Sequence, residues 1–321
     1  MINKIALIGL GYIGKIHLKI LNENPNWDLV GVYDINTTLC KELASKYNIK
    51  AFSSLEEAIN NSQVLDIATP SNTHFEIAKQ AIINGKHVFI EKPVTSNVKE
   101  AKQLLNYINE AGICFQVGHV ERFNPAFIAA KPYLHDPMFI EIHRLAQYNP
   151  RGTDVSVVLD LMMHDLDLIL SIVKANVKKI HVSGCDLVSK TADIINARIE
   201  FENGCVANIT TNRVAFKNVR KFRVFTKNHF VSINLLDKIT EVIKIKNAGL
   251  NSKNLILDPG NGTQKKEIVF EHPIILPTNA INEELNTLYE CINLNKKTIV
   301  GIDEAIRVLE LATEIEEKLK L

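Results

Sequence analysis

KIALIGLGYIG, residues 4–14, is the stretch that decides the fold. The apolar run Ile5–Ile8 predicts a buried parallel strand, and it leads directly into the pattern G-x-G-x-x-G. The first glycine permits a tight turn, the second lets the backbone approach a pyrophosphate, and the third lets the next helix pack close to the strand. The N-terminus of that helix favours phosphate groups. The candidate cofactor-binding residues of this turn are Gly9, Gly11, Tyr12, Ile13 and Gly14.

An acidic residue stands where such a fold holds the ribose of its cofactor. A second apolar strand, Leu29–Tyr33, ends in Asp34, twenty residues after Gly14. A carboxylate there accepts hydrogen bonds from the adenosine ribose and repels a 2′-phosphate. Residues 35–37 offer no Arg or Lys to hold such a phosphate. We therefore expect NAD rather than NADP; the alternative is that the glycines mark an ordinary turn between strand and helix.

The composition limits the class of protein. The chain has 321 residues, a formal net charge of +1 and a pI near 7.7, so it can build two cores and lacks the bulk charge of a nucleic-acid binder. Its five cysteines include no C-x-x-C pair, which predicts reduced thiols and no zinc site. No apolar run approaches membrane-span length, and the N-terminus resembles a strand rather than a signal peptide. We expect a cytoplasmic protein without a metal, nucleic-acid or membrane partner.

The two halves of the chain differ in strand pattern. Up to about Gly118, apolar strands alternate with helical stretches, which predicts an α/β first domain over residues 1–120 with a doubly wound parallel sheet of the Rossmann type. We expect residues 121–321 to form an α+β domain with a large, mostly antiparallel open sheet flanked by helices. The C-terminal helix is a candidate for packing back on the first domain. Predicted strands are 139–148, 178–187, 194–201, 205–212 and 221–226, predicted helices are 155–173, 280–293 and 302–320, and 247–266 is expected to be a loop or irregular hairpin.

Lys92 is the first candidate catalytic residue. It follows the predicted strand 87–90, at the edge of the sheet where ligands bind in open α/β folds. A lysine near a positively charged nicotinamide can have a lowered pKa and join a proton relay. Pro93 biases its backbone towards an extended conformation. The alternative is a solvated lysine in a surface turn.

A second group of polar residues lies on the predicted helix 155–173. Asp160, His164 and Asp167 have the spacing i, i+4, i+7, which places them on one helix face. An imidazole beside carboxylates can accept a hydroxyl proton near neutral pH. The alternatives are a structural histidine and a metal site, although no further His or Cys ligand stands nearby.

A third polar group marks the junction between the halves. The segment Gly118–Pro125 contains His119, Arg122 and Asn124 directly after a predicted strand. Such a group is suited to line a cleft between domains. The alternative is a polar hinge ending in Pro125.

Together these motifs resemble the Gfo/Idh/MocA family of NAD(P)-dependent sugar and cyclitol oxidoreductases, over essentially the whole chain. The resemblance rests on the glycine pattern with Asp34, the segment Thr69–His74, Glu91-Lys92-Pro93 and the helix from Asp160 to His164. It implies that the lysine lies beside the nicotinamide and the substrate hydroxyl, that the aspartate and the histidine complete the site, and that the histidine is the acid/base. Further cofactor contacts implied by the family are Thr69, Pro70, Asn72, His74, Glu91 and Lys92.

One local departure stands beside the resemblance. Many members carry a glycine pair before this helix and a glycine two residues after its aspartate, whereas here Val157, Val158 and Met162 occupy those places. The backbone and the roof of the pocket are therefore expected to differ.

Segments 118–125 and 154–165 look like one branch of the family, the UDP-N-acetylglucosamine 3-dehydrogenases. That resemblance implies oxidation of the sugar 3-hydroxyl to a ketone, which a partner aminotransferase converts to an amine for a lipid A precursor. Alternatives are a UDP-N-acetylglucosaminuronate, a free sugar or an inositol as substrate, or a non-catalytic NAD-binding regulator. We also expect a homodimer or homotetramer. Expected substrate contacts are His119, Arg122, Asn124, Arg144, Arg151, Asp160 and His164, with the arginines at 122, 144, 151 and 213 as candidates for the diphosphate.

Overall fold

The computed structural model describes residues 3–149, 155–249, 254–260 and 262–319. The chain divides into two compact units, residues 1–123 with 278–310 and residues 124–277 with 311–321. The sequence predicts a domain boundary at residue 120, close to the first change of unit after residue 123. It also predicts that all residues after 120 form the second domain, whereas α8 (Ala280–Leu294) and the first half of α9 (Ile302–Leu319) belong to the first unit.

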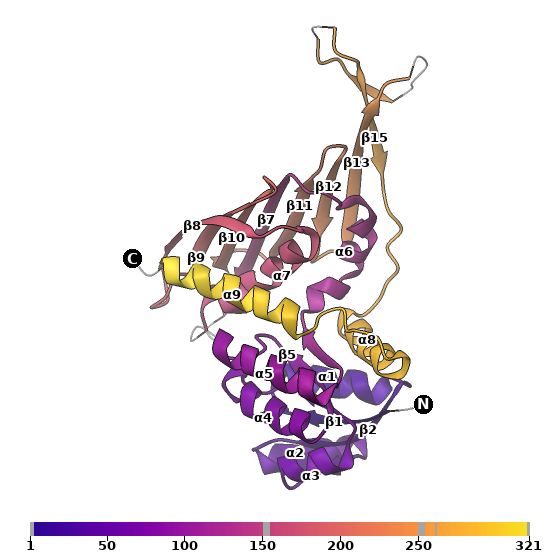
Figure 1. Cartoon of the computed structure of the whole chain (residues 1–321), viewed down its shortest axis with the longest axis vertical. Helices are drawn as coiled ribbons and strands as arrows, with labels where there is room; N and C mark the ends of the chain where they lie inside the picture. Colours follow the sequence, from indigo (N-terminus) through magenta and orange to yellow (C-terminus); the bar gives the residue numbers. More distant parts are fainter. Residues whose placement is uncertain (1–2, 150–154, 250–253, 261, 320–321) are drawn as a thin grey trace. The chain divides into compact units, whose positions relative to one another are not determined.

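The first unit, whose N-terminal part is indigo to magenta in Figure 1, contains a six-stranded, wholly parallel sheet. Its strand order is β3-β2-β1-β4-β5-β6. This confirms the predicted doubly wound Rossmann sheet. The order reverses between β1 and β4, which is where such sheets bind dinucleotides. The elements are β1 (Asn3–Ile8), α1 (Tyr12–Glu23), β2 (Trp27–Tyr33), α2 (Thr37–Tyr47), β3 (Lys50–Ala51), α3 (Leu55–Asn61), β4 (Val64–Ile67), α4 (Ser71–Ile83), β5 (His87–Glu91), α5 (Val98–Ala111), β6 (Phe115–Gly118) and the 3₁₀ helix η1 (Val120–Phe123).

Several helices of this unit begin at polar caps that the sequence supplies. The side chains of Asn36, Ser54 and Asn97 accept hydrogen bonds from backbone N–H groups in the first turns of α2, α3 and α5. Each cap satisfies a donor that the helix itself leaves unpaired. These caps fix where the helices start, and hence how long the turns at the sheet edge are.

The core of the first unit includes a segment from the far end of the sequence. Leu285 and Leu288 of α8 are fully buried in the same apolar cluster as Ile5 and Leu7 of β1. The ring of Trp27 on β2 also meets the ring of Tyr289 edge-on, with 5.5 Å between centroids. Burying two leucines contributes roughly 3–6 kcal/mol. Helix α8 is therefore a structural part of the cofactor-binding unit.

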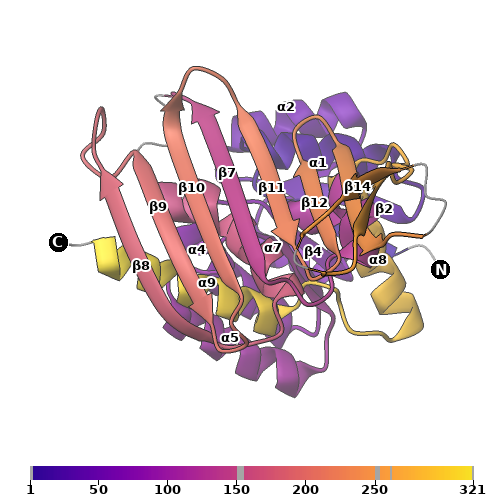
Figure 2. The same cartoon turned by 90° about the horizontal axis from the view of Figure 1, so that it is seen from above.

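The second unit is built on a nine-stranded sheet in the order β14-β15-β13-β12-β11-β7-β10-β9-β8. Only β7 and β10 pair in parallel, which confirms the predicted mostly antiparallel sheet. The helices of this unit pack on one face of its sheet, and none of the unit's described helices covers the other face (Figure 2). The elements are α6 (Pro125–Ala130), η2 (Lys131–Tyr133), β7 (Phe139–Gln147), the π-helix η3 (Val158–Met162), α7 (Met163–Ile172), β8 (Val177–Cys185), β9 (Ile194–Phe201), β10 (Val206–Ala215), β11 (Val219–Phe225), β12 (His229–Asn234), β13 (Ile239–Asn247), β14 (Leu255–Leu257) and β15 (Lys266–Glu271).

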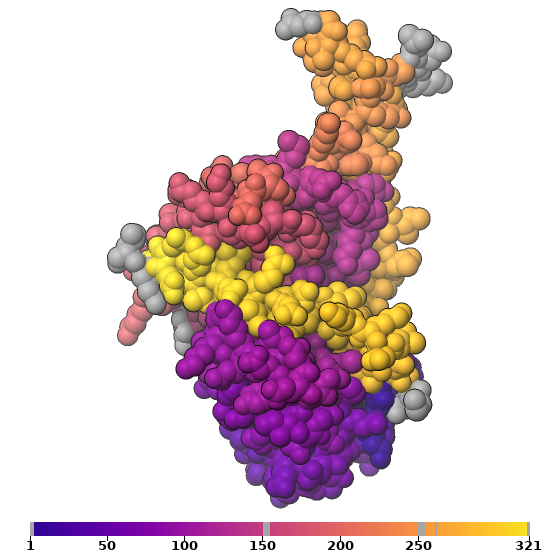
Figure 3. Space-filling view, in the orientation of Figure 1, coloured from indigo at the N-terminus to yellow at the C-terminus, as the bar shows by residue number. Residues whose placement is uncertain are grey.

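The sequence did not predict strands β12 to β15. The segment expected to be a loop or irregular hairpin, 247–266, contains β14, which pairs antiparallel with β15. All three residues of β14 are exposed, so the alternation that marks a half-buried strand is missing. The ribbon of β13 and β15 extends beyond the body of this unit (Figures 1 and 3).

No helix among the described residues has the length and apolar composition needed to cross a lipid bilayer. The 18-residue α9 illustrates why, because it carries charged side chains from Asp303 to Lys318 along its length.

Candidate active site

The glycine-rich turn connects β1 to α1 and is shaped for a phosphate. Gly9 has a φ of 95°, and a Cβ at Gly14 would lie 2.0 Å from the Gly9 carbonyl oxygen, so neither position accepts a larger residue without moving the turn. No side chain caps the N-terminus of α1, which leaves that helix end to an anionic ligand. Tyr12 is 82% exposed and Ile13 is 38% exposed at the same place. These features fit the pyrophosphate of a dinucleotide.

Asp34 is held against the glycine turn. Its Oδ2 accepts a hydrogen bond from the Leu10 N–H at 2.6 Å, and its Oδ1 accepts one from the Asn36 N–H at 2.8 Å. The structure thus brings together the acid and the glycines, which the sequence separates. The carboxylate is preorganised by two backbone donors, and its contact with a ribose stays a prediction.

The segment Thr69–His74 forms the turn between β4 and α4. His74 is buried, with Nε2 2.8 Å from the Thr69 carbonyl oxygen and Nδ1 2.9 Å from the Pro93 carbonyl oxygen. Burial lowers the pKa of His74, which favours the neutral imidazole. This side chain therefore connects the turn after β4 to the turn after β5, while Thr69, Pro70 and Asn72 remain at the surface.

Lys92 lies directly after β5, at the same edge of the sheet as the glycine turn and Thr69. Its side chain is partly buried, and the peptide bond to Pro93 is cis. The preceding residue, Glu91, accepts a hydrogen bond from the Lys92 N–H at 3.2 Å. The first unit thus gathers its predicted cofactor residues at the carboxyl ends of β1, β4 and β5, where α/β folds bind ligands.

The polar segment after β6 is divided between the units. His119 and Arg122 are buried in the first unit, where the Arg122 N–H donates to the His119 carbonyl. Asn124 belongs to the second unit and caps α6. Its Oδ1 accepts from the Ala126 N–H at 3.1 Å, and its Nδ2 donates to the Leu235 carbonyl at 2.9 Å. Both atoms of the Asn124 amide thus bind backbone groups of the second unit. Asn directly before a proline at the first helical position is a favoured cap.

His164 and Asp160 lie on either side of a change in helix type. Asp160 is exposed in the π-helix η3, and His164 is partly buried in the first turn of α7. Asp167, the third polar residue of the predicted group, is fully buried. The wider π turn shifts the helical phase before Met163, so a period of 3.6 residues does not apply across it.

Arg144 requires a correction. We expected it to contact a diphosphate, but its guanidinium is 3% exposed and binds Asp165 through two bonds, Nε–Oδ2 at 2.7 Å and Nη2–Oδ1 at 2.8 Å. A planar guanidinium matches a carboxylate as well as it matches a phosphate. This pair connects β7 to α7 beside His164, so Arg144 supports the helix that carries the histidine.

Arg213 is used in a similar way. It donates from Nε to Asp193 at 3.0 Å, from Nη1 to the Val155 carbonyl at 2.9 Å and from Nη2 to the Thr191 hydroxyl at 2.8 Å. Burial would raise the pKa of Asp193, but backbone donors at residues 187–189 hold it far below its usual range. Arg213 therefore stabilises the loop before β9. The fourth candidate, Arg151, lies outside the described residues.

Sequence reasoning missed two buried titratable residues of the first unit, His17 and Asp66. His17 Nδ1 lies 2.8 Å from Asp66 Oδ2, and both side chains are fully buried. A signal was present for Asp66, because a charged residue within the apolar strand Val64–Ile67 needs a buried partner. Its partner is 49 residues away in sequence, which no local pattern reveals.

Comparison with known proteins agrees with this geometry. A parallel sheet with a glycine turn and a preorganised acid defines a dinucleotide-binding protein. Residues 3–119 match the model of the oxidoreductase family with an NAD-binding Rossmann fold, and residues 136–230 match the GFO/IDH/MocA C-terminal domain. The chain therefore belongs to the Gfo/Idh/MocA family. It is an NAD-dependent sugar dehydrogenase.

Individual relatives cover most of the chain. The UDP-N-acetylglucosamine 3-dehydrogenase of Acidithiobacillus ferrooxidans is 32% identical over 242 residues, which is 74% of this chain and 75% of the relative. A solved structure of that enzyme superimposes with a TM-score of 0.89 over 100% of this chain and 98% of its own. The NAD-dependent scyllo-inositol 2-dehydrogenase of Bacillus subtilis is 26% identical over 65% of this chain and 67% of the relative.

Replacing Asp34 by serine is expected to weaken NAD binding by about 10–100-fold, because charge-assisted hydrogen bonds to the ribose are lost. NADP binding should stay the same or improve, since the repulsion of its 2′-phosphate is removed. Titration calorimetry with both cofactors measures the ratio. Asp28→Ser, an exposed aspartate on the same strand, is the matched control and should change neither affinity. An unchanged NAD to NADP ratio in Asp34→Ser contradicts the role of Asp34.

Proposed function

We propose that this protein oxidises the 3-hydroxyl of UDP-N-acetylglucosamine to the 3-keto sugar with NAD. The observation that carries the proposal is the 32% identity, over 74% of the chain, to an enzyme with that activity. The retained lysine and histidine support catalysis over a regulatory role, because a regulator that only binds NAD needs neither. The ketone would then pass to an aminotransferase that supplies an amine for a lipid A precursor.

In this proposal, Lys92, His164 and Asp160 act on the hydroxyl and on the hydrogen of the same carbon. Bound NAD supplies a hydride acceptor at its nicotinamide C4. His164 accepts the hydroxyl proton, and the hydrogen on the same carbon leaves as a hydride with the electron pair of the C–H bond. The electron pair of the O–H bond then forms the carbon–oxygen double bond of the ketone. Lys92 donates a hydrogen bond to the oxygen as its negative charge grows, and Asp160 orients the hydroxyl or the lysine.

The diphosphate of a UDP-sugar needs cationic partners. Of the four arginines that the sequence suggests for this role, Arg144 and Arg213 bind Asp165 and Asp193. We propose that Arg122 and Arg151 contribute to binding the diphosphate. We also propose a homodimer or homotetramer, with the sheet face that no described helix of the second unit covers as the candidate surface (Figure 2).

A deuterium-transfer assay tests both the substrate and the position of oxidation. The protein is incubated with NAD, UDP-N-acetylglucosamine carrying deuterium at C3, an aminotransferase and its amino donor, which removes the ketone. We expect the reduced-nicotinamide absorbance to grow and the deuterium to appear in the reduced cofactor. Substrate deuterated at C2 is the matched control and should transfer none.

A substrate panel separates the alternatives. UDP-N-acetylglucosaminuronate, free N-acetylglucosamine and inositols are tested under the same conditions. Turnover of a free sugar or inositol without any turnover of the UDP-sugar would overturn the proposal in favour of the inositol dehydrogenase type. NAD binding without oxidation of any member would favour a regulator.

A further inference from the structure

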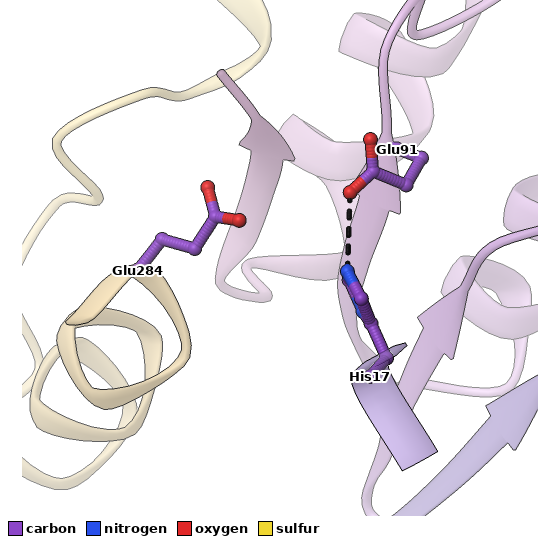
Figure 4. Close-up of side chains that lie close together, drawn as sticks. All are labelled: His17, Glu91 and Glu284. Carbon is purple, nitrogen blue, oxygen red and sulfur yellow. Dashed lines mark ion pairs between the residues drawn. The ribbon is translucent and has the colours of Figure 1, made fainter. Parts of the chain in front are cut away.

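A cluster of titratable side chains lies inside the first unit and is not explained by the proposed mechanism. Figure 4 shows His17, Glu91 and Glu284 pointing toward one another from α1, β5 and α8. One polar atom from each of the three lies within 4.8 Å of the other two. Asp66 of β4 completes the cluster through its 2.8 Å contact with His17 Nδ1. Apart from Glu91, whose side chain is 17% exposed, the members are fully buried, so they interact through protein rather than water.

His17 links two carboxylates within this cluster. Burial by itself would lower the pKa of His17, but Asp66 and Glu91 raise it well above the usual value of 6.5. The resulting imidazolium carries an N–H on each ring nitrogen. Nδ1 lies 2.8 Å from Asp66 Oδ2, and Nε2 lies 3.2 Å from Glu91 Oε1. His17 thus connects β4 to β5 with a charge on both contacts.

Glu91 connects His17 to Lys92, because its carboxylate contacts both residues. Its Oε1 faces His17, and its Oε2 accepts a hydrogen bond from the Lys92 N–H at 3.2 Å. Burial would raise the pKa of Glu91, but His17 and Lys92 lower it, so the carboxylate is ionised. Gly118 of β6 leaves it room, since a Cβ there would lie 2.8 Å from Oε1 and 3.2 Å from Oε2. The carboxylate is therefore held on several sides.

Glu284 brings a further carboxylate from α8. Its backbone carbonyl accepts a hydrogen bond from the Gln116 side chain of β6, which fixes α8 against the strand next to β5. Burial raises the pKa of Asp66, although the contact with His17 opposes this shift. A protonated His17 offsets part of the negative charge that the three carboxylates can carry.

We propose that His17 is a positioning residue for Lys92. Together with Asp66 it fixes the Glu91 carboxylate, and Glu91 in turn fixes the backbone of the lysine and the charge around its ammonium group. The inference rests on the proposed function only for the part that Lys92 plays in turnover. Misplacing a catalytic group by about 1 Å costs on the order of 10²-fold in rate, so such a support is functionally important.

Two amide substitutions separate the contacts of His17. The amide nitrogen of asparagine takes the place of Nδ1 and keeps the contact with Asp66, whereas that of glutamine takes the place of Nε2 and keeps the contact with Glu91. We expect His17→Asn to lower kcat by about 10–100-fold with little change in the KM for NAD, and His17→Gln to recover most of the loss. A purely structural role would affect both variants alike.

A second readout does not depend on the substrate. The rate at which an acylating reagent modifies Lys92 is measured over a pH series by peptide mass spectrometry, with the exposed Lys99 as internal control. We expect the Lys92 profile to shift in His17→Asn and in Glu91→Gln, and to shift less in His17→Gln, which removes the positive charge but keeps the contact with Glu91. Lys99 should react equally in all proteins. If the wild type oxidises no UDP-sugar, the proposed function fails while this measurement still tests the role of His17.

The outcomes are distinct. An unchanged Lys92 profile in folded His17→Asn and Glu91→Gln, checked by circular dichroism, would overturn the proposal. So would a stoichiometric metal ion found in the purified wild type by elemental analysis, because a metal bound to Nε2 replaces the proton that faces Glu91. Glu23→Gln, at the exposed end of α1, is the matched control and should resemble the wild type.

Discussion

Replacement of His164 by alanine is expected to lower kcat by about 10²–10⁴-fold, the usual contribution of a positioned acid/base. The imidazole is partly buried in the first turn of α7, where the neighbouring ion pair of Asp165 with Arg144 anchors the helix. Without the His164 imidazole, the hydroxyl proton has no acceptor when the hydride leaves. The affinity for NAD should change little, because the glycine turn and Asp34 belong to the other unit.

The control for this measurement is His135→Ala, which removes an exposed histidine of the same unit. It should retain wild-type kcat. Turnover is followed at the reduced-nicotinamide band, and NAD binding by titration calorimetry. A His164→Ala enzyme within a few-fold of wild type, or one that no longer binds NAD, contradicts the assigned role.

Replacement of Asp165 by alanine is expected to lower the free energy of unfolding of the second unit by about 3–5 kcal/mol, because it leaves the Arg144 guanidinium buried without its carboxylate. Replacing both partners by apolar residues, Arg144→Met with Asp165→Leu, should recover much of the loss, since no charge then remains buried. Hydrogen exchange of peptides from β7 and α7 measures the effect locally. The single tryptophan, Trp27, lies in the first unit and does not report on it.

The partly exposed pair of Arg223 with Glu141, at 2.8 Å between β11 and β7, provides the comparison. Glu141→Ala should cost less than about 1 kcal/mol, because exposed ion pairs are screened by solvent. Equal losses in the free energy of unfolding for Asp165→Ala and Glu141→Ala would show that burial does not determine how much the Arg144–Asp165 pair stabilises the second unit.

Local patterns in the sequence were sufficient for the first sheet. The strand before Gly9 and the acid at Asp34 are signals read within a few residues, and the structure confirms the parallel sheet that they predict. The ribbon of β13 to β15 was not predictable in this way. Alternation of buried and exposed residues is present only at the start of β13, and the residues of β14 are all exposed.

The site was less predictable because side-chain partners are set by tertiary structure. An arginine such as Arg144 or Arg213 has the same appearance in sequence whether it binds a phosphate or an aspartate, and here both bind aspartates. The π turn before Met163 likewise interrupts the 3.6-residue period on which the predicted shared face was based. Spacing in the sequence could not link Glu284 to His17, because residues 18–283 lie between them.

The late position of α8 in the chain has a consequence for biosynthesis. Leu285 and Leu288 complete the apolar cluster around β1, yet a ribosome makes them only after the entire sheet of the second unit. During translation, part of the apolar core of the NAD-binding sheet therefore stays uncovered until α8 is made. The second unit must begin to fold while it is joined to this incomplete first unit. Nascent domains ordinarily fold in order from the N-terminus, but here the first unit cannot be completed until the sheet of the second unit has been synthesised.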